Sequence, residues 1–247
     1  QNKTKGLDLD YATQWSYGID ESLSFIIPGV MGGASSYDVG TDSELYKSLV
    51  KHGVPRNSAA QFCSGVPLYW GDQPFTAGNV YMGAIVCFLF VLGLLIVKGP
   101  YKWAILAATL FSVFLAWGHN FMPLTEFFFK YFLLYIKFRA VSSILIVAEI
   151  TMPLLGFLAV KVLMDGSITK EKAIRNIYTA AGITAGLCLF IALFGSMVFD
   201  FHAPVDASLA SLPDFAYQGI LDERASLMRS DALRSFLFIV LAAATDR

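Results

Sequence analysis

The sequence predicts an all-α, polytopic integral membrane protein with about four complete transmembrane helices and a truncated fifth. Apolar residues make up 56% of the 247 residues, and charged residues only 15%. Soluble domains carry about 25% charged residues, so a chain this poor in charge suits lipid as its solvent. Several long runs without charge also approach the length that a bilayer core demands.

The first 79 residues are mixed in character, with polar and aromatic side chains and many Gly and Pro residues. Ile19–Gly29 predicts a short helix. Thr41–Gly53 predicts a second one, with Asp42 or Ser43 as its N-cap. Neither is long enough to cross a membrane, so we expect an extracytoplasmic segment here.

The remaining boundaries follow the apolar runs and the stretches between them. In order, we expect a transmembrane hairpin at 80–117 (spans 80–97 and 103–117), an outer interfacial helix at 118–140, a second hairpin at 141–199 (spans 141–160 and 177–199), an extracytoplasmic loop at 200–232 and a partial span at 233–247.

Basic residues predict the orientation of these spans. Lys98 and Lys102 lie in the first short connection, and Lys161–Arg175 carries four basic residues in the connection after the third span. Both connections belong inside by the positive-inside rule. The segments 1–79, 118–140 and 200–232 should therefore face outward.

The outer segment 118–140 is almost entirely aromatic and aliphatic after Pro123, and is too short to cross a bilayer. We expect a helix that lies in the outer interface. It leads directly to Lys137 and Arg139, which would then lie at headgroup level. The Arg139 guanidinium suits bidentate contact with a phosphate, although anchoring to ordinary lipid headgroups explains this basic pair equally simply.

Glu149 lies inside the third predicted span, four residues before Pro153. A carboxylate at that depth should face protein or a water-filled cavity. A proton relay or a substrate cavity would use it, and a hydrogen-bonded structural residue is the alternative. Pro153 removes one helical hydrogen bond and should kink the helix.

The stretch 67–81 enters the first span from outside and combines aromatic rings with polar groups. Tyr69 and Trp70 could stack on the C–H face of a sugar, while Asp72 and Gln73 bind its hydroxyls. An interfacial aromatic belt with a Gly-Asp turn is the simpler explanation of the same residues. The sequence leaves both open.

Other function classes find little support. The net charge of −1 argues against nucleic acid as a partner. No phosphate-binding loop, dinucleotide motif, zinc-protease motif or nucleophile elbow occurs, and the three cysteines show no metal spacing. No cofactor is evident, and a divalent metal stays open. The sequence has no initiator Met and ends within an apolar run, which we interpret as a fragment of a longer protein.

Five stretches taken together resemble the YfhO family of bacterial membrane proteins. They are YATQWSYG (11–18), YWGDQPFTAG (69–78), WGHNFMP (117–123), KFRAVSSILIVAEITMPLLG (137–156) and RSDALRSFLFIV (229–240). The resemblance covers essentially the whole chain, and its motifs are specific only in combination.

The resemblance implies a GT-C-type glycosyltransferase of the bacterial cytoplasmic (inner) membrane. Such an enzyme moves a sugar from a polyprenyl-phosphate donor to a cell-envelope polymer on the outer face. It also implies a catalytic carboxylate in a first outer loop that this sequence does not contain, so the catalytic residue is unassigned. Arg139 and Lys137 would hold the donor phosphate. A transporter or flippase of lipid-linked sugars, supported by Glu149, and a non-catalytic membrane scaffold are the alternatives.

Overall fold

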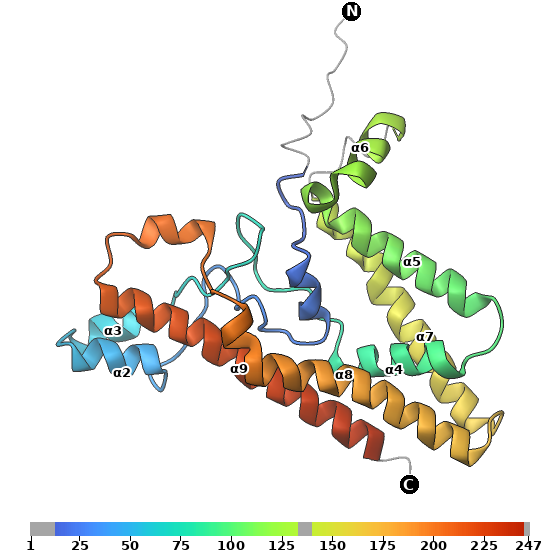
Figure 1. Cartoon of the computed structure of the whole chain (residues 1–247). Helices are drawn as coiled ribbons and strands as arrows, with labels where there is room; N and C mark the ends of the chain where they lie inside the picture. The colour runs from blue at the N-terminus through green and yellow to red at the C-terminus, as the bar shows by residue number, and fades with distance from the viewer. Residues whose placement is uncertain (1–12, 133–139, 245–247) are drawn as a thin grey trace, which may run out of the picture. The chain divides into compact units, whose positions relative to one another are not determined.

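The computed structural model describes residues 13–132 and 140–244, and within these ranges the chain is helical and contains no β-strand (Figure 1). One isolated antiparallel bridge joins Tyr37 and Val66. The chain forms two compact units. Among the described residues, unit 1 comprises 13–22, 72–74, 86–132 and 140–180, and unit 2 comprises 23–71, 75–85 and 181–244.

The short N-terminal helices agree with the sequence prediction. A 3₁₀-helix, η1, covers Asp20–Phe25, and α2 covers Glu44–Lys51. Ser43 caps α2, because its side chain accepts a hydrogen bond from the backbone N–H of Tyr46. A further helix, α3 (Arg56–Cys63), was not predicted; it begins directly after Pro55.

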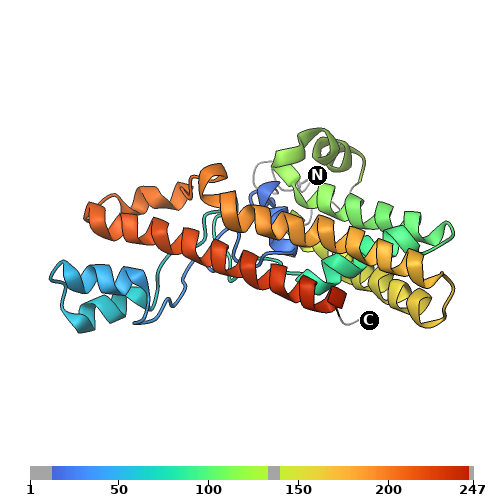
Figure 2. The same ribbon diagram turned by 60° about the horizontal axis from the view of Figure 1, so that its bottom comes forward.

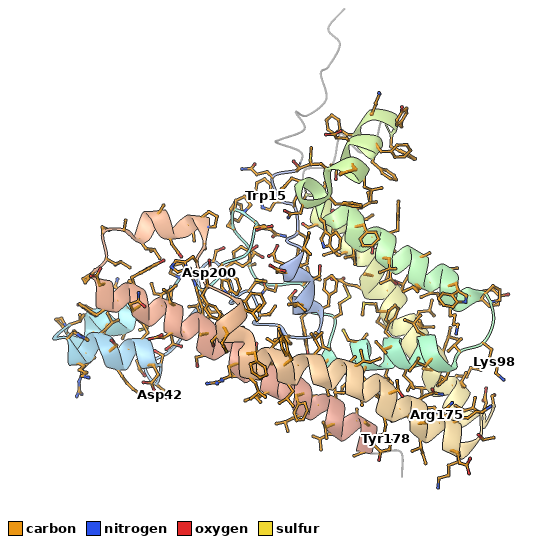
Figure 3. The ribbon with its side chains drawn as sticks, in the orientation of Figure 1. Trp15, Asp42, Lys98, Arg175, Tyr178 and Asp200 are labelled. Atoms are coloured by element: carbon orange, nitrogen blue, oxygen red, sulfur yellow. The ribbon has the colours of Figure 1, made fainter. Side chains whose placement is uncertain are left out.

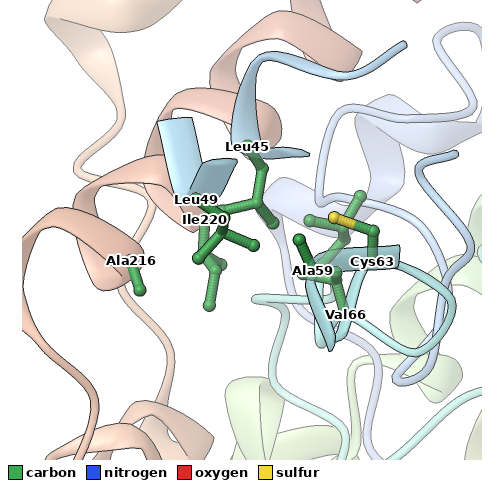
Figure 4. Packing of buried hydrophobic residues seen from close by; sticks show 8 residues of the cluster. Leu45, Leu49, Ala59, Cys63, Val66, Ala216 and Ile220 are labelled. Atoms are coloured by element: carbon green, nitrogen blue, oxygen red, sulfur yellow. The ribbon is translucent and has the colours of Figure 1, made fainter. Parts of the chain in front are cut away.

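Unit 2 packs α2 and α3 against the long helix α9 (Asp214–Ala244). Figure 4 shows the buried side chains that join them, which include Leu45 and Leu49 of α2, Cys63 of α3 and Ile220 of α9. Burying such side chains contributes about 1.5–3 kcal/mol each before entropy is counted. This core therefore fixes the N-terminal helices on α9.

The first apolar helices lie at least partly in unit 1. They are α4 (Ala84–Ile96), α5 (Tyr101–Ala116) and α6 (Met122–Tyr131), with the 3₁₀-turn η2 (Gly118–Phe121) between the last two. The chain bends by 114° between α5 and the η2–α6 segment. A separate helix thus follows α5 in the region predicted to be interfacial, and it covers the part of 118–140 that is described.

Two further helices are long enough to cross a membrane. The 3₁₀-turn η4 (Val141–Leu145) continues into α7 (Ile146–Met164), and α8 covers Lys170–Val198. The described residues contain two helices of sufficient length and apolar character, or three if the bent pair from Tyr101 to Tyr131 is one span. The helix α7 continues through Pro153.

The structure corrects several boundaries. In the first predicted span only α4 is helical, and α8 begins seven residues before its predicted span. The loop predicted at 200–232 is largely helical instead, with η5 at Pro204–Leu209 and α9 from Asp214 onward. The polar residues between 221 and 231 obscured α9, because they break the apolar run without breaking the helix.

Glycines mark where helices pack closely. A Cβ on Gly93 of α4 would lie 2.7 Å from the Leu155 side chain of α7, and one on Gly195 of α8 2.5 Å from Met228 of α9. Figure 2 shows the end of α8 alongside α9, in agreement with that contact. By contrast, Gly182 and Gly186 of α8 are exposed, and nothing among the described residues lies within 4 Å of their Cβ positions.

Candidate functional site

Segments from four distant parts of the chain meet at the C-terminal end of α5 in unit 1. Gly118 has φ +47°, which favours glycine, and a Cβ there would collide with the Oγ atom of Ser16. The same Cβ position lies 2.9 Å from Val141. Trp117 Nε1 donates to the Oγ atom of Ser22 at 2.9 Å. These contacts fix the chain around residues 16–22 against the end of α5.

Two carboxylates lie beside Gly18. A Cβ on Gly18 would be 3.1 Å from Oδ2 of Asp72 and 3.1 Å from Oε2 of Glu21, so both oxygens border the same small space. The backbone N–H of Gly18 donates to Oε2 of Glu21 at 2.5 Å. Glu21 is 3% exposed, whereas Asp72 is exposed. One acidic group is therefore fixed in the interior, and the other faces outward.

Asn120 orients Asp72. Its Nδ2 group donates to Oδ2 of Asp72 at 2.7 Å and to the carbonyl oxygen of Tyr17 at 3.1 Å. These two bonds use both amide hydrogens, so the Asn120 side chain has one preferred orientation. Asp72 keeps its second oxygen and its remaining lone pairs for another donor.

His119 adds a nitrogen ligand or base to this group. Its Nδ1 atom lies 3.2 Å from the carbonyl oxygen of Thr13, and its backbone N–H donates to the Oγ atom of Ser16. A carbonyl oxygen only accepts, so the proton of the neutral ring is on Nδ1 and Nε2 carries the lone pair. The His119 side chain is exposed.

We call Glu21, Asp72, His119 and Asn120 the α5-end cluster. At the end of an apolar helix this cluster exposes the Asp72 carboxylate and the His119 imidazole, whereas Glu21 is buried and the amide hydrogens of Asn120 are already bonded. Such groups suit a ligand with several hydroxyls. Residues 13–132 and 140–244 contain no group of three or more His, Cys, Asp or Glu that could hold a metal ion.

The predicted sugar-binding residues are not all in this cluster. Asp72 and Gln73 belong to unit 1, whereas Tyr69 and Trp70 belong to unit 2. Tyr69 is only 4% exposed, so its ring is covered in this structure, and its stacking role stays a prediction that this burial does not favour. Trp70 is half-buried, with edge contacts to Phe199 and Phe201 at centroid distances of 5.5 and 5.3 Å. Its role in sugar binding stays a prediction.

The other predicted site residues have different outcomes. Lys137 and Arg139 lie outside the described residues, so their phosphate contact stays a prediction. Glu149 is exposed on α7. Ala148 and Met152 occupy the buried side of the helix, and the expectation that the Glu149 carboxylate faces protein or a water-filled cavity stays a prediction.

Sequence reasoning missed Glu21 and Asn120 as site residues. Glu21 had been assigned only to a short helix, and Asn120 to a motif without a role. The sequence did offer one signal. Three of the five stretches that resemble the YfhO family, 11–18, 69–78 and 117–123, contribute residues to the α5-end cluster or contact it.

A buried ion pair in unit 2 was also missed. Arg224 of α9 is fully buried, and its Nη1 and Nη2 atoms donate to the Asp206 carboxylate at 2.9 and 2.8 Å. The same guanidinium donates to the carbonyl oxygens of Phe201 and Pro67 at 2.7 and 2.8 Å. Arg224 thus joins the stretch before Trp70 to the segment that follows α8 (Figure 3, near Asp200).

The pKa of Asp206 is lowered in the folded protein. Burial raises it, but hydrogen bonds from Arg224 and from the backbone N–H of Ala203, with the charge of Arg224, outweigh burial. A lowered folded pKa means that the unfolded state binds more protons. The stabilisation is complete above the unfolded value near 3.8 and is lost as the pH falls through the folded pKa.

We therefore expect the melting temperature to fall when the pH drops from about 5 to about 3, and to fall less in an Asp206→Asn variant. Burial raises the pKa of Asp231, so this residue gives stability the opposite pH dependence in both proteins. The informative quantity is therefore the difference in the fall of melting temperature between the unchanged protein and the Asp206→Asn variant. Thermal unfolding in detergent at both pH values measures it. Parallel pH profiles would contradict the role of Asp206.

No protein-family model, curated protein sequence or solved structure shows significant similarity to this chain. The resemblance to the YfhO family stays a prediction from the quoted stretches. Function must be argued from the chemistry of the described residues.

Proposed function

We propose that the protein transfers a sugar from a polyprenyl-phosphate carrier to a cell-envelope acceptor at the outer face of a bacterial cytoplasmic membrane. The observation that carries the proposal is the α5-end cluster, in which Glu21 and Asp72 border one space and Asn120 holds Asp72. Carboxylates and an amide at the end of an apolar helix suit the hydroxyls of a sugar attached to a lipid.

The topology in this proposal follows from the lysines. Lys98 and Lys102 precede most of α5 and belong inside by the positive-inside rule, so the other end of α5 faces outward. In this arrangement α6 lies in the outer interface after the 114° bend. The proposal keeps the four spans and partial fifth predicted from the sequence, with 1–79, 118–140 and 200–232 outside.

The donor phosphate has its own proposed site. Val141 contacts Gly118 at the end of α5, and Arg139 precedes Val141 by two residues in the sequence. The Arg139 guanidinium, assisted by Lys137, would bind the phosphate and stabilise it as a leaving group. Asp72, held by Asn120, would accept hydrogen bonds from sugar hydroxyls. The catalytic carboxylate is not assigned.

An Asp72→Asn variant should raise the apparent KM for the sugar donor about tenfold, because its amide oxygen keeps the bond from Asn120 Nδ2 and a donor NH2 group then replaces the acceptor oxygen that faces the sugar. Membrane vesicles from cells that express the full-length protein, supplied with a radiolabelled polyprenyl-phosphate sugar, would be assayed for transfer and for released polyprenyl phosphate, because this chain alone is expected to be inactive. Asp42→Asn, an exposed carboxylate outside the cluster, is the matched control.

Three outcomes are distinct in this assay. A selective effect of Asp72→Asn, and loss of transfer in Arg139→Ala at equal protein abundance, support the transferase and its two subsites. Equal kinetics for Asp72→Asn and Asp42→Asn would remove the cluster from sugar binding. Sugar movement across the membrane without released polyprenyl phosphate would reject transfer altogether.

One observation favours the transporter as a second candidate. Glu149 is exposed within a helix that is otherwise apolar and long enough to cross a membrane. A carboxylate at that depth requires a polar partner or a water path. Substrate movement that depends on Glu149 would identify this function.

A further inference from the structure

A basic pocket lies in unit 1 where the turn between α4 and α5 approaches the start of α8. Its volume is about 580 Å³. Figure 3 labels Lys98, on this turn, and Arg175, one residue before Asn176 of the pocket wall. The residues that line it include Lys98, Lys102, Trp103, Ile168, Lys172 and Asn176.

Three lysines and no carboxylate line this pocket. Among the described residues, none of the three lysines forms an ion pair. Lys102 Nζ donates to the carbonyl oxygen of Leu94 at 2.8 Å and lies 5.2 Å from the Trp103 ring centroid. Three cations around one cavity repel one another unless an anion is present.

Two helix starts add to the positive potential. The helix α5 begins at Tyr101, and no side chain caps it. The helix α8 begins at Lys170, which places Lys172 in its first turn together with Glu171, an acidic residue that offsets part of this potential but does not line the pocket. Lysines near a helix N-terminus are unfavourable because the unpaired N–H groups already carry partial positive charge. An anion in the pocket would reverse the sign of these interactions.

The wall of the pocket is also apolar. Leu95, Ile96 and Ile168 contribute to it, and the Trp103 ring is 61% exposed beside it. An indole at the end of an apolar helix is typical of the level where headgroups meet acyl chains. The ligand that fits this combination has a phosphate group and a hydrocarbon part.

We propose that this pocket binds the phosphate headgroup of an anionic membrane lipid at the end of α5 opposite the α5-end cluster. Lys98, Lys102 and Lys172 contact the phosphate, Asn176 donates to the headgroup, and the acyl chains follow the exposed apolar side chains of α4 and α5. The site differs in position and ligand from the sugar-binding cluster, and does not depend on it.

Lipid nanodiscs test this site directly. The purified chain would be placed in phosphatidylcholine discs with increasing fractions of brominated phosphatidylglycerol, which quenches nearby tryptophan. The signal of Trp103 is the difference between the protein and its Trp103→Phe variant. We expect Lys98→Gln or Lys172→Gln to raise the half-saturating lipid fraction about fivefold, because each cation near the surface contributes roughly that factor.

Lys161→Gln is the matched control, since Lys161 is exposed on α7 and does not line the pocket. Unchanged quenching in this control, with loss in the two pocket variants, supports the site. Equal loss in all three variants would reduce the effect to net charge and overturn it. Competition by millimolar inorganic phosphate at constant lipid would assign the pocket to free phosphate and reject the lipid.

Discussion

Replacing Arg224 by alanine should lower the free energy of unfolding by about 3–5 kcal/mol, the cost of removing one partner of a buried ion pair. Arg224 is fully buried, and only 9% of the Asp206 side chain is exposed. The substitution leaves the Asp206 carboxylate without its main partner. It also removes the donors to the carbonyl oxygens of Pro67 and Phe201. Thermal and denaturant unfolding in detergent would measure the change.

Lys47→Ala is the appropriate control for Arg224→Ala. Lys47 pairs with Glu44 at 2.7 Å, but both side chains are more than half exposed and the pair is screened by solvent, so its loss should leave the stability nearly unchanged. An equal cost for the two substitutions would show that burial of the Arg224 pair has no energetic consequence. A double replacement, Arg224→Met with Asp206→Leu, should recover part of the loss because no unpaired charge remains.

Arg224 also connects α9 to the two chain segments that position Trp70. Pro67 precedes Trp70 by three residues, and Phe201 contacts the Trp70 ring. Arg224 bonds to both carbonyl oxygens, so one α9 side chain holds the two segments that position the ring. Phe201 has a positive φ of 59°, which is costly for an aromatic residue and requires such support.

Local signals predicted the parts of the fold that depend on neighbouring residues. The Ser43 cap of α2 and the apolar length of α7 and α8 follow from short stretches of sequence. The start of α9 was missed, because a helix held by tertiary contacts needs no continuous apolar run. The core around Leu45 and Ile220 gives that helix its support.

The candidate site was predictable only in fragments. Asp72 was selected for its chemistry, but its partners Asn120 and Glu21 lie far away in the sequence, and no local period indicates such contacts. The same holds for Arg224 and Asp206, which lie on two different elements, α9 and η5, so no helical period relates them. For Glu149 the sequence indicated only its position along the span, because the face of α7 that packs depends on tertiary contacts; among the described residues this side chain is exposed.

Gly32→Ala should cost about 2–5 kcal/mol, from backbone strain together with a steric clash. Gly32 has φ +77°, and a Cβ there would collide with the carbonyl oxygen of Leu68 and lie 3.1 Å from Trp70 Cδ1. The clash involves backbone, so a change of rotamer does not relieve it. Thermal unfolding of the variant measures the cost.

Gly40→Ala separates the cost of backbone strain from the cost of the steric clash. Gly40 has a similar φ of +74°, but nothing lies within 4 Å of its Cβ position, so it bears strain of only about 1–2 kcal/mol. The excess cost at Gly32 then measures the close approach of the 29–32 turn to Leu68. Because the backbone N–H of Trp70 donates to the carbonyl oxygen of Met31, that excess should come with a changed tryptophan emission spectrum. Equal costs at both glycines, with unchanged emission, would mean that the turn moves away freely and does not fix Trp70.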